Sequence, residues 1–262
     1  MQADRRLGLQ SLASDIQSST DLHGVAPEEI LTIVTGLPRS GTSLMMQIPE
    51  AAGIPLFTDG KRPANASNER GYHEHERTAS LLTSPDKSWL SNAKGHAIKI
   101  VAPLLTTIPD TLKTRILFMD RSMNGILQSQ SSMLDRLGKE PPRGDVTRGY
   151  LQQSRHARTW INARGIPALG VRYQSLVHRP DEILSQIAAF LGAEDNLEAM
   201  RDVIDPTLHR ARAEGPWPWP WPLLRPLPVN NARSILSLRF SGSSSLQNGE
   251  FSTAFDPVLR PD

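Results

Sequence analysis

The chain has 262 residues, of which 38% are hydrophobic and 21% are charged, a composition that allows one sizeable folded core. It contains no cysteine, which excludes disulfides and cysteine-ligated zinc or iron–sulfur sites, and its formal net charge of +2 is too small by itself to indicate a nucleic-acid partner. No run approaches the roughly 20 apolar residues of a membrane span, and the N-terminus lacks the apolar core of a signal peptide, so we expect a soluble, cytoplasmic protein.

Short apolar runs alternate along the chain with longer stretches of helical character. Four runs predict buried strands, at residues 31–35, 97–101, 115–119 and 169–173. Five stretches predict helices, at residues 43–52, 74–82, 124–137, 146–164 and 180–191. Pro49 should kink the first helix, Pro180 should begin the last one and Gly192 should end it. The alternation predicts an α/β fold in which helices cover both faces of a central parallel sheet.

The chain divides into three parts. Residues 1–29 form an N-terminal extension, and residues 30–210 form the α/β domain. Residues 211–262 form a tail in which a Pro/Trp-rich stretch, GPWPWPWPLLRPLP, precedes a Ser/Gly-rich one. Proline lacks the N–H that a helix needs, so the tail should be extended. Two interpretations of the tail are open. In one it packs on its own domain or is disordered, and in the other its tryptophans dock on a partner or a membrane interface.

The segment GLPRSGTS, residues 36–43, follows the first predicted strand and nearly matches the phosphate-binding loop G-x-x-x-x-G-K-[ST]. Gly36 and Gly41 have the required separation, but Thr42 stands where that loop has its lysine. A cation is present instead at Arg39, where it can hydrogen-bond the oxygen on which charge develops during a group transfer. Such a loop, at a helix N-terminus, predicts an anion site made by Ser40, Gly41, Thr42 and Ser43. Taken alone, the segment is also compatible with an ordinary Gly/Ser turn.

Another arginine and serine follow the third predicted strand. In RILFMDRSMNGILQSQSSM, Arg121 ends the strand and Ser129 lies eight positions later in the next helix. Two groups at this spacing can converge on one anion, because the serine reaches back from the second turn of the helix. Farther along, VRYQSLVHRPDEILSQIAAFLG places Tyr173 at the end of the fourth predicted strand.

These three segments together resemble the sulfotransferases that use 3′-phosphoadenosine 5′-phosphosulfate, in the bacterial and Golgi type that carries P-R-S-G-T. The resemblance runs from about residue 30 to residue 192, and it implies the three-layer fold of P-loop NTPases. It implies that the loop binds the 5′-phosphosulfate, that Arg121 and Ser129 bind the 3′-phosphate, and that Tyr173 lies near the nucleotide. The chain departs from the family at Gln174 and Ser175, which replace Glu-Asp, and it lacks the late R-K-G-x-x-G-D-W-K-N segment.

Sulfuryl transfer to an alcohol needs a base near the acceptor hydroxyl. Cytosolic relatives use a histidine two residues after a lysine, but here Lys99 is followed by Val101 at that position. The polar segment 59–81 resembles the N-P-x-G-[YF]-x-E passage of bacterial members, which implies Glu74 as the base. His73 and His75 are alternatives, because imidazole is a competent base near neutral pH. A further alternative is that these residues only begin a solvated helix.

The predicted function is the transfer of a sulfuryl group to a hydroxyl or amine of a small-molecule, carbohydrate, lipid or peptide acceptor. Lys99 is expected to pair with a phosphosulfate oxygen. No metal should be required, because hydrogen-bond donors can stabilise the departing adenosine 3′,5′-bisphosphate, and the H-E-H string lacks the spacing of metal ligands. Two alternatives remain, a non-catalytic nucleotide-binding or scaffold protein of the same fold, and a P-loop kinase. The sequence specifies neither the acceptor nor the oligomeric state.

Overall fold

The computed structural model describes residue 22 and residues 24–61, 71–140 and 146–205. Most of the predicted N-terminal extension and the whole predicted tail lie outside the described residues. The α/β domain, predicted for residues 30–210, is therefore the part of the chain on which the structure bears.

Four parallel strands form the sheet, in the order β2-β1-β3-β4. They are β1 (Leu31–Gly36), β2 (Ala97–Lys99), β3 (Thr114–Asp120) and β4 (Ala168–Arg172). Every residue of β1 is buried, as expected for a central strand that is covered on both faces. The prediction of an α/β fold with a parallel sheet is confirmed. Strand β2 is shorter than predicted, because the chain turns after Ile100 into a short 3₁₀ helix, Ala102–Thr107.

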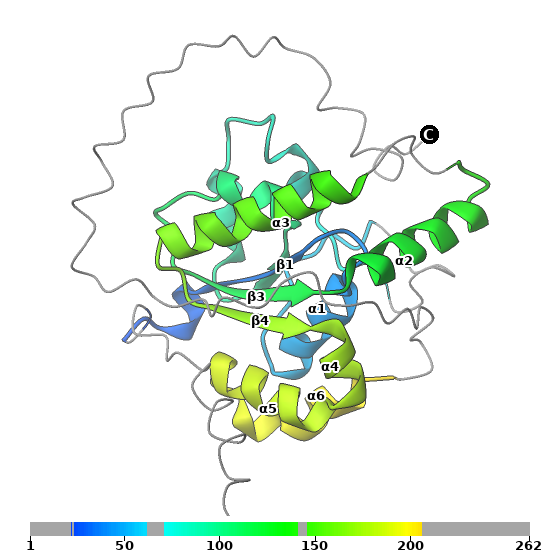
Figure 1. Cartoon of the computed structure of the whole chain (residues 1–262). Coiled ribbons are helices and arrows are strands. Elements are labelled where there is room, and N and C mark those ends of the chain that lie inside the picture. The colour runs from blue at the N-terminus through cyan, green and yellow to red at the C-terminus, as the bar shows by residue number, and fades with distance from the viewer. Residues whose placement is uncertain (1–21, 23, 62–70, 141–145, 206–262) are drawn as a thin grey trace, which may run out of the picture.

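Alternate strand residues form two apolar cores, one on each face of the sheet. On one face Ile33, Ile116 and Phe118 pack with Ile161 of α3 (Val146–Ala163). On the other face strand residues such as Leu117 pack with α1 (Thr42–Ala51), α5 (Pro180–Leu191) and α6 (Leu197–Asp202). Figure 1 shows α3 on one side of the sheet and these three helices on the other. Helices thus flank both faces, as in a three-layer arrangement.

Two further helices follow strands at the carboxyl edge of the sheet. Helix α2 (Met123–Arg136) follows β3 and extends beyond the end of that strand (Figure 1). Helix α4 (Tyr173–His178) follows β4 directly. The predicted strand at residues 169–173 was wrong at its end, because β4 ends at Arg172 and Tyr173 is the first residue of α4.

The predicted helix at residues 74–82 was also wrong. Only a short 3₁₀ helix forms there, Glu76–Ser80. The backbone before it cannot be helical, because His73 has a φ of 49°. The backbone groups of this segment instead bond across to residues 58 and 59. The last predicted helix is confirmed, with Pro180 in its first turn and Gly192 ending it at a left-handed φ of 68°. Pro49 lies close to the end of α1.

The strand order creates a divergence point between β1 and β3. The chain leaves β1 for β2 on one side, and it leaves β3 for β4 on the other. In open parallel sheets, ligands bind outside the carboxyl ends of the strands at such a point. The loop after β1 and the segment after β3 therefore border the position where this fold favours a ligand.

Candidate functional site

The loop of residues 37–41 turns tightly from β1 into α1. A Cβ on Gly36 would lie 2.5 Å from both the Met119 carbonyl oxygen and Ser40 Oγ, so glycine allows the loop to pass close to β3. Gly41 is the N-cap of α1 and has a φ of 104°. Ser40 is buried, and its Oγ forms no hydrogen bond with any described residue. Because buried hydroxyls normally have a partner, this group at a helix N-terminus favours an anionic ligand.

Arg39 links this loop to the segment after β3 and to α2. It has a φ of 67°, which is uncommon for a residue with a side chain and is often found at functional sites. Its Nε donates to Ser129 Oγ over 3.1 Å, and its carbonyl oxygen accepts from Nη1 of Arg121 over 3.0 Å. Three predicted site residues thus lie together, with Arg39 bonded to both of the others.

Arg121 and Tyr173 form a stack next to the loop. Arg121 is 8% exposed, and its guanidinium carbon lies 4.4 Å from the centre of the Tyr173 ring. Burial lowers the pKa of Arg121, and the nearby charge of Arg39 lowers it further. The Tyr173 ring also packs against the loop, because a Cβ on Gly41 would lie 2.8 Å from Tyr173 Cε2. Tyr173 therefore fills the space between Gly41 and Arg121, although it does so from α4 and not from a strand.

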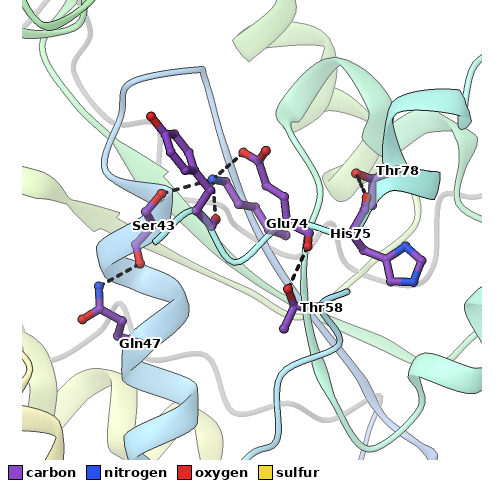
Figure 2. Close-up of polar contacts among 8 residues, drawn as sticks. Ser43, Gln47, Thr58, Glu74, His75 and Thr78 are labelled. Carbon is purple, nitrogen blue, oxygen red and sulfur yellow. Dashed lines mark hydrogen bonds and ion pairs between the residues drawn. The ribbon is translucent and has the colours of Figure 1, made fainter. Parts of the chain in front are cut away.

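Lys99, at the end of β2, connects α1 to Glu74. Figure 2 labels its partners Ser43 and Glu74, and dashed lines mark the contacts. Its Nζ donates to Ser43 Oγ over 3.2 Å, to the Tyr72 carbonyl oxygen over 3.0 Å and to Glu74 Oε1 over 2.9 Å. These three acceptors match the three protons of an ammonium. The Lys99 side chain is 6% exposed and that of Glu74 is 24% exposed. A ligand oxygen that pairs with Lys99, as the sequence predicts, would have to replace or share one of these partners.

Glu74 and His75 are neighbours in sequence but face different surroundings. The Glu74 carboxylate points toward Lys99, whereas Figure 2 shows the His75 ring pointing away from it. That ring stacks on Phe57 and Trp89, with centroid distances of 4.9 and 5.2 Å. Thr58 Oγ1 donates to the Glu74 carbonyl oxygen over 2.8 Å and fixes the backbone at this point. Of these two predicted bases, the geometry favours Glu74.

Asp120 and Arg158 are two charged residues of this region that the sequence motifs do not include. Asp120 ends β3 directly before Arg121, and its Oδ2 lies 2.5 Å from Nη2 of Arg158 in α3. The available signal was the acidic residue at the end of an otherwise apolar run, ILFMD. Its partner lies 38 positions away, a separation that no local pattern indicates.

Among the described residues, no group of three or more His, Asp or Glu side chains is arranged to hold a metal ion. None of the helices in this part of the chain combines the length and the apolar character needed to cross a bilayer. No protein-family model matches the chain, and a comparison with curated proteins finds no significant match. The class that fold and site define is an α/β protein with arginine, lysine and serine side chains gathered at the carboxyl edge of its parallel sheet.

Proposed function

We propose that this protein is a sulfotransferase that moves a sulfuryl group from 3′-phosphoadenosine 5′-phosphosulfate to a hydroxyl or amine. The observation that carries the proposal is the convergence of two sets of anion-binding groups at the divergence point of the sheet. One set is the start of α1 with the buried Ser40 hydroxyl. The other is Arg121 with Ser129, and Arg39 is bonded to both of these residues. Two such sets suit a ligand with two phosphate groups.

The residues present fit this donor. Ser40 Oγ and the N–H groups at the start of α1 would hold the 5′-phosphate, and Arg121 and Ser129 would hold the 3′-phosphate. The donor, when bound, supplies the sulfuryl group and leaves as adenosine 3′,5′-bisphosphate. Arg39, as the cation of the loop, would stabilise the charge on that leaving group. Because Arg39 donates to Ser129 in this structure, a phosphate at Ser129 must share or replace that hydrogen bond.

The contact between Lys99 and Ser43 favours this proposal over a P-loop kinase. In the P-loops of kinases and ATPases, the hydroxyl at the position of Ser43 binds magnesium. Here the Lys99 ammonium lies 3.2 Å from that hydroxyl. The side chain therefore supplies positive charge where a kinase holds its metal, which suits transfer without a metal requirement.

Glu74 is the proposed general base. Its carboxylate is oriented by Lys99 and keeps enough exposure, 24%, for an acceptor to reach it. In this proposal the carboxylate takes the proton of the acceptor hydroxyl as the sulfuryl group is transferred. Lys99 has a positioning role, since it binds Glu74 and the first turn of α1 together.

The proposal is tested by isothermal titration with adenosine 3′,5′-bisphosphate, AMP and ATP. We expect the bisphosphate to bind at least about tenfold more tightly than AMP. One hydrogen bond to a charged group contributes about 1.5–3 kcal/mol, and about 1.4 kcal/mol corresponds to a tenfold change in Kd. Arg121→Ala should remove most of this preference and leave AMP binding nearly unchanged. Arg179→Ala, at an exposed ion pair with Glu182, is the control and should change neither affinity.

Equal binding of the three nucleotides, or binding of none, contradicts the proposal. Bisphosphate binding without sulfuryl transfer to any member of a broad acceptor panel would favour the non-catalytic alternative. Magnesium-dependent turnover of ATP would favour the kinase.

A further inference from the structure

Asp120 is a mostly buried carboxylate at the point where β3 ends. Its side chain is 18% exposed, and its Oδ2 lies 2.5 Å from Nη2 of Arg158. The carboxylate also accepts a hydrogen bond from the backbone N–H of Arg121. Burial raises the pKa of Asp120, and the contacts with Arg158 and with this N–H, together with the charge of Arg172, oppose the increase. Asp120 thus joins α3 to the main chain of Arg121.

Arg158 is itself held in place on α3. Its guanidinium carbon lies 4.5 Å from the centre of the Phe118 ring, and its Nε lies 3.4 Å from Ser154 Oγ. A planar guanidinium that is stacked on a ring and bonded at its edge has a defined orientation. Arg158 therefore fixes the Asp120 carboxylate relative to the sheet.

The side chain of Arg121 is packed closely enough to be sensitive to the position of its main chain. Its Nη1 donates to the Arg39 carbonyl oxygen, and its guanidinium stacks on Tyr173. A Cβ on Gly125 would lie 2.9 Å from Arg121 Nε, so there is little room on the side of α2. A change in the backbone at residue 121 would therefore redirect the guanidinium, and hydrogen bonds weaken steeply when their geometry is distorted.

We infer that Asp120 and Arg158 are a positioning pair that fixes Arg121 for recognition of a 3′-phosphate. The inference rests on the proposed function and adds two residues to it. The pair acts through Arg121. Arg158 also compensates the negative charge of Asp120, which would otherwise repel a phosphate bound at the neighbouring arginine.

The experiment is a double-mutant cycle between Asp120→Asn and Arg121→Ala. Asparagine is the same size as aspartate, but its amide group cannot form the ion pair with Arg158. We expect Asp120→Asn to weaken binding of adenosine 3′,5′-bisphosphate about tenfold and to change AMP binding less than about twofold. In the Arg121→Ala background, Asp120→Asn should have no further effect on the preference for the bisphosphate, because the two changes act on the same contact.

The other end of α3 offers a matched control. Arg164 follows that helix, forms an ion pair with Asp110 and lies 4.7 Å from the centre of the Trp160 ring. Asp110 and Arg164 line a cavity at the amino edge of the sheet, opposite the proposed site. Asp110→Asn and Arg164→Met should leave both nucleotide affinities unchanged.

Two changes at Arg158 keep the inference testable if Asp120→Asn does not fold. Arg158→Met should lower the bisphosphate preference as Asp120→Asn does. Arg158→Lys keeps a cation beside Asp120 but loses the planar fork, and it should lower the preference by a smaller factor. Thermal denaturation and far-UV circular dichroism of each variant show whether it is folded.

The possible results separate the inference from the proposed function. An unchanged preference in the folded variants overturns the inference and leaves the proposed function intact. Equal weakening of bisphosphate and AMP also overturns it, because that result indicates a general structural role. Tighter bisphosphate binding by Asp120→Asn overturns the inference as well, because it would mean that the Asp120 carboxylate repels the phosphate and does not position Arg121. Absence of any preference in the wild-type protein contradicts the proposed function instead.

Discussion

Charged side chains lie at both the amino edge and the carboxyl edge of the sheet, but their surroundings differ. At the amino edge a cavity of about 410 Å³ is lined by residues that include Leu112, Trp160 and Arg164. The ion pair at this edge leaves the Asp110 side chain 76% exposed. At the carboxyl edge Lys99 and Arg121 are only 7% and 8% exposed, and both form hydrogen bonds with neighbouring loops. One cavity thus lies at the amino edge, and these two buried cations lie at the carboxyl edge.

This difference follows from the direction of the strands. After each parallel strand the chain passes the carboxyl edge, so α1 and α2 both begin there. Helix N-termini carry partial positive charge and free N–H groups, which favour anions, whereas α3 ends near the amino edge. The proposed anion site is therefore placed where buried polar groups and helix N-termini converge, and not at the cavity of the amino edge.

Replacing Glu74 should cause the largest loss among the carboxyl-edge groups. The amide of Glu74→Gln cannot accept a proton, so sulfuryl transfer should fall by about 10²- to 10⁴-fold. Binding of adenosine 3′,5′-bisphosphate should change little, because the proposal assigns no phosphate contact to Glu74, whose carboxylate pairs with Lys99. The measurement is single-turnover transfer from the donor to an acceptor found in a panel, together with titration of the bisphosphate.

Glu76→Gln is the control for this prediction. The Glu76 side chain is 57% exposed and pairs with Lys61, so its loss should leave transfer unchanged. A full transfer rate in Glu74→Gln would assign the proton transfer to another group. His73 would then be the next residue to replace.

Two glycine replacements test how closely the carboxyl edge is packed. Gly41 and Gly138 both have a positive φ, 104° and 61°. Alanine at position 138 lies in the left-handed region and is strained by about 1 kcal/mol, whereas at position 41 the φ lies outside that region and the strain is larger. At Gly138 no atom lies within 4 Å of the added Cβ, whereas at Gly41 the Cβ would overlap the Tyr173 ring. Gly41→Ala should therefore displace the ring or the loop and weaken bisphosphate binding by about 10- to 100-fold, as expected for the loss of one hydrogen bond to a charged group.

In Gly138→Ala the free energy of unfolding should fall only by the strain energy, and the variant should bind the bisphosphate as the wild-type protein does. Urea unfolding gives the free energy of unfolding of each variant, and titration gives its affinity. Similar affinities in the two variants would mean that the loop and Tyr173 can separate without consequence for binding.

The parts of the site that sequence could predict are those with local signals. Gly36, Gly41 and the apolar run before them lie in one short segment, so the turn from strand to helix is evident from spacing alone. Arg121 and Ser129 are likewise fixed by the end of one strand and the start of one helix. These residues do lie near one another in the structure, with Arg39 between them.

The parts that sequence could not predict depend on distant contacts or on backbone geometry. Lys99 bonds to Glu74 and Ser43, which are 25 and 56 positions away. The side chains of Glu74 and His75 point in different directions. The backbone here is fixed by a hydrogen bond from Thr58 to the Glu74 carbonyl oxygen, and not by the hydrogen bonds of the predicted helix. Tyr173 continues an apolar run that is typical of a strand, but the chain has already turned into α4.

The smallest expected effect concerns the pH dependence of stability at the buried ion pair. Burial raises the pKa of Asp120 above its usual 3.8 despite the contact with Arg158. A carboxyl group whose pKa is higher in the folded protein binds its proton more tightly there, so its contribution to stability is present below pH 3.8 and is lost as the pH rises through the folded pKa. The asparagine variant has no such proton. The stability of the wild-type protein relative to Asp120→Asn should therefore decrease as the pH rises through this range, as measured by urea unfolding of the two proteins at matched pH values. The opposite slope would mean that attraction to Arg158 and Arg172 outweighs the cost of burying the carboxylate, and that the carboxyl edge gains stability from these charges.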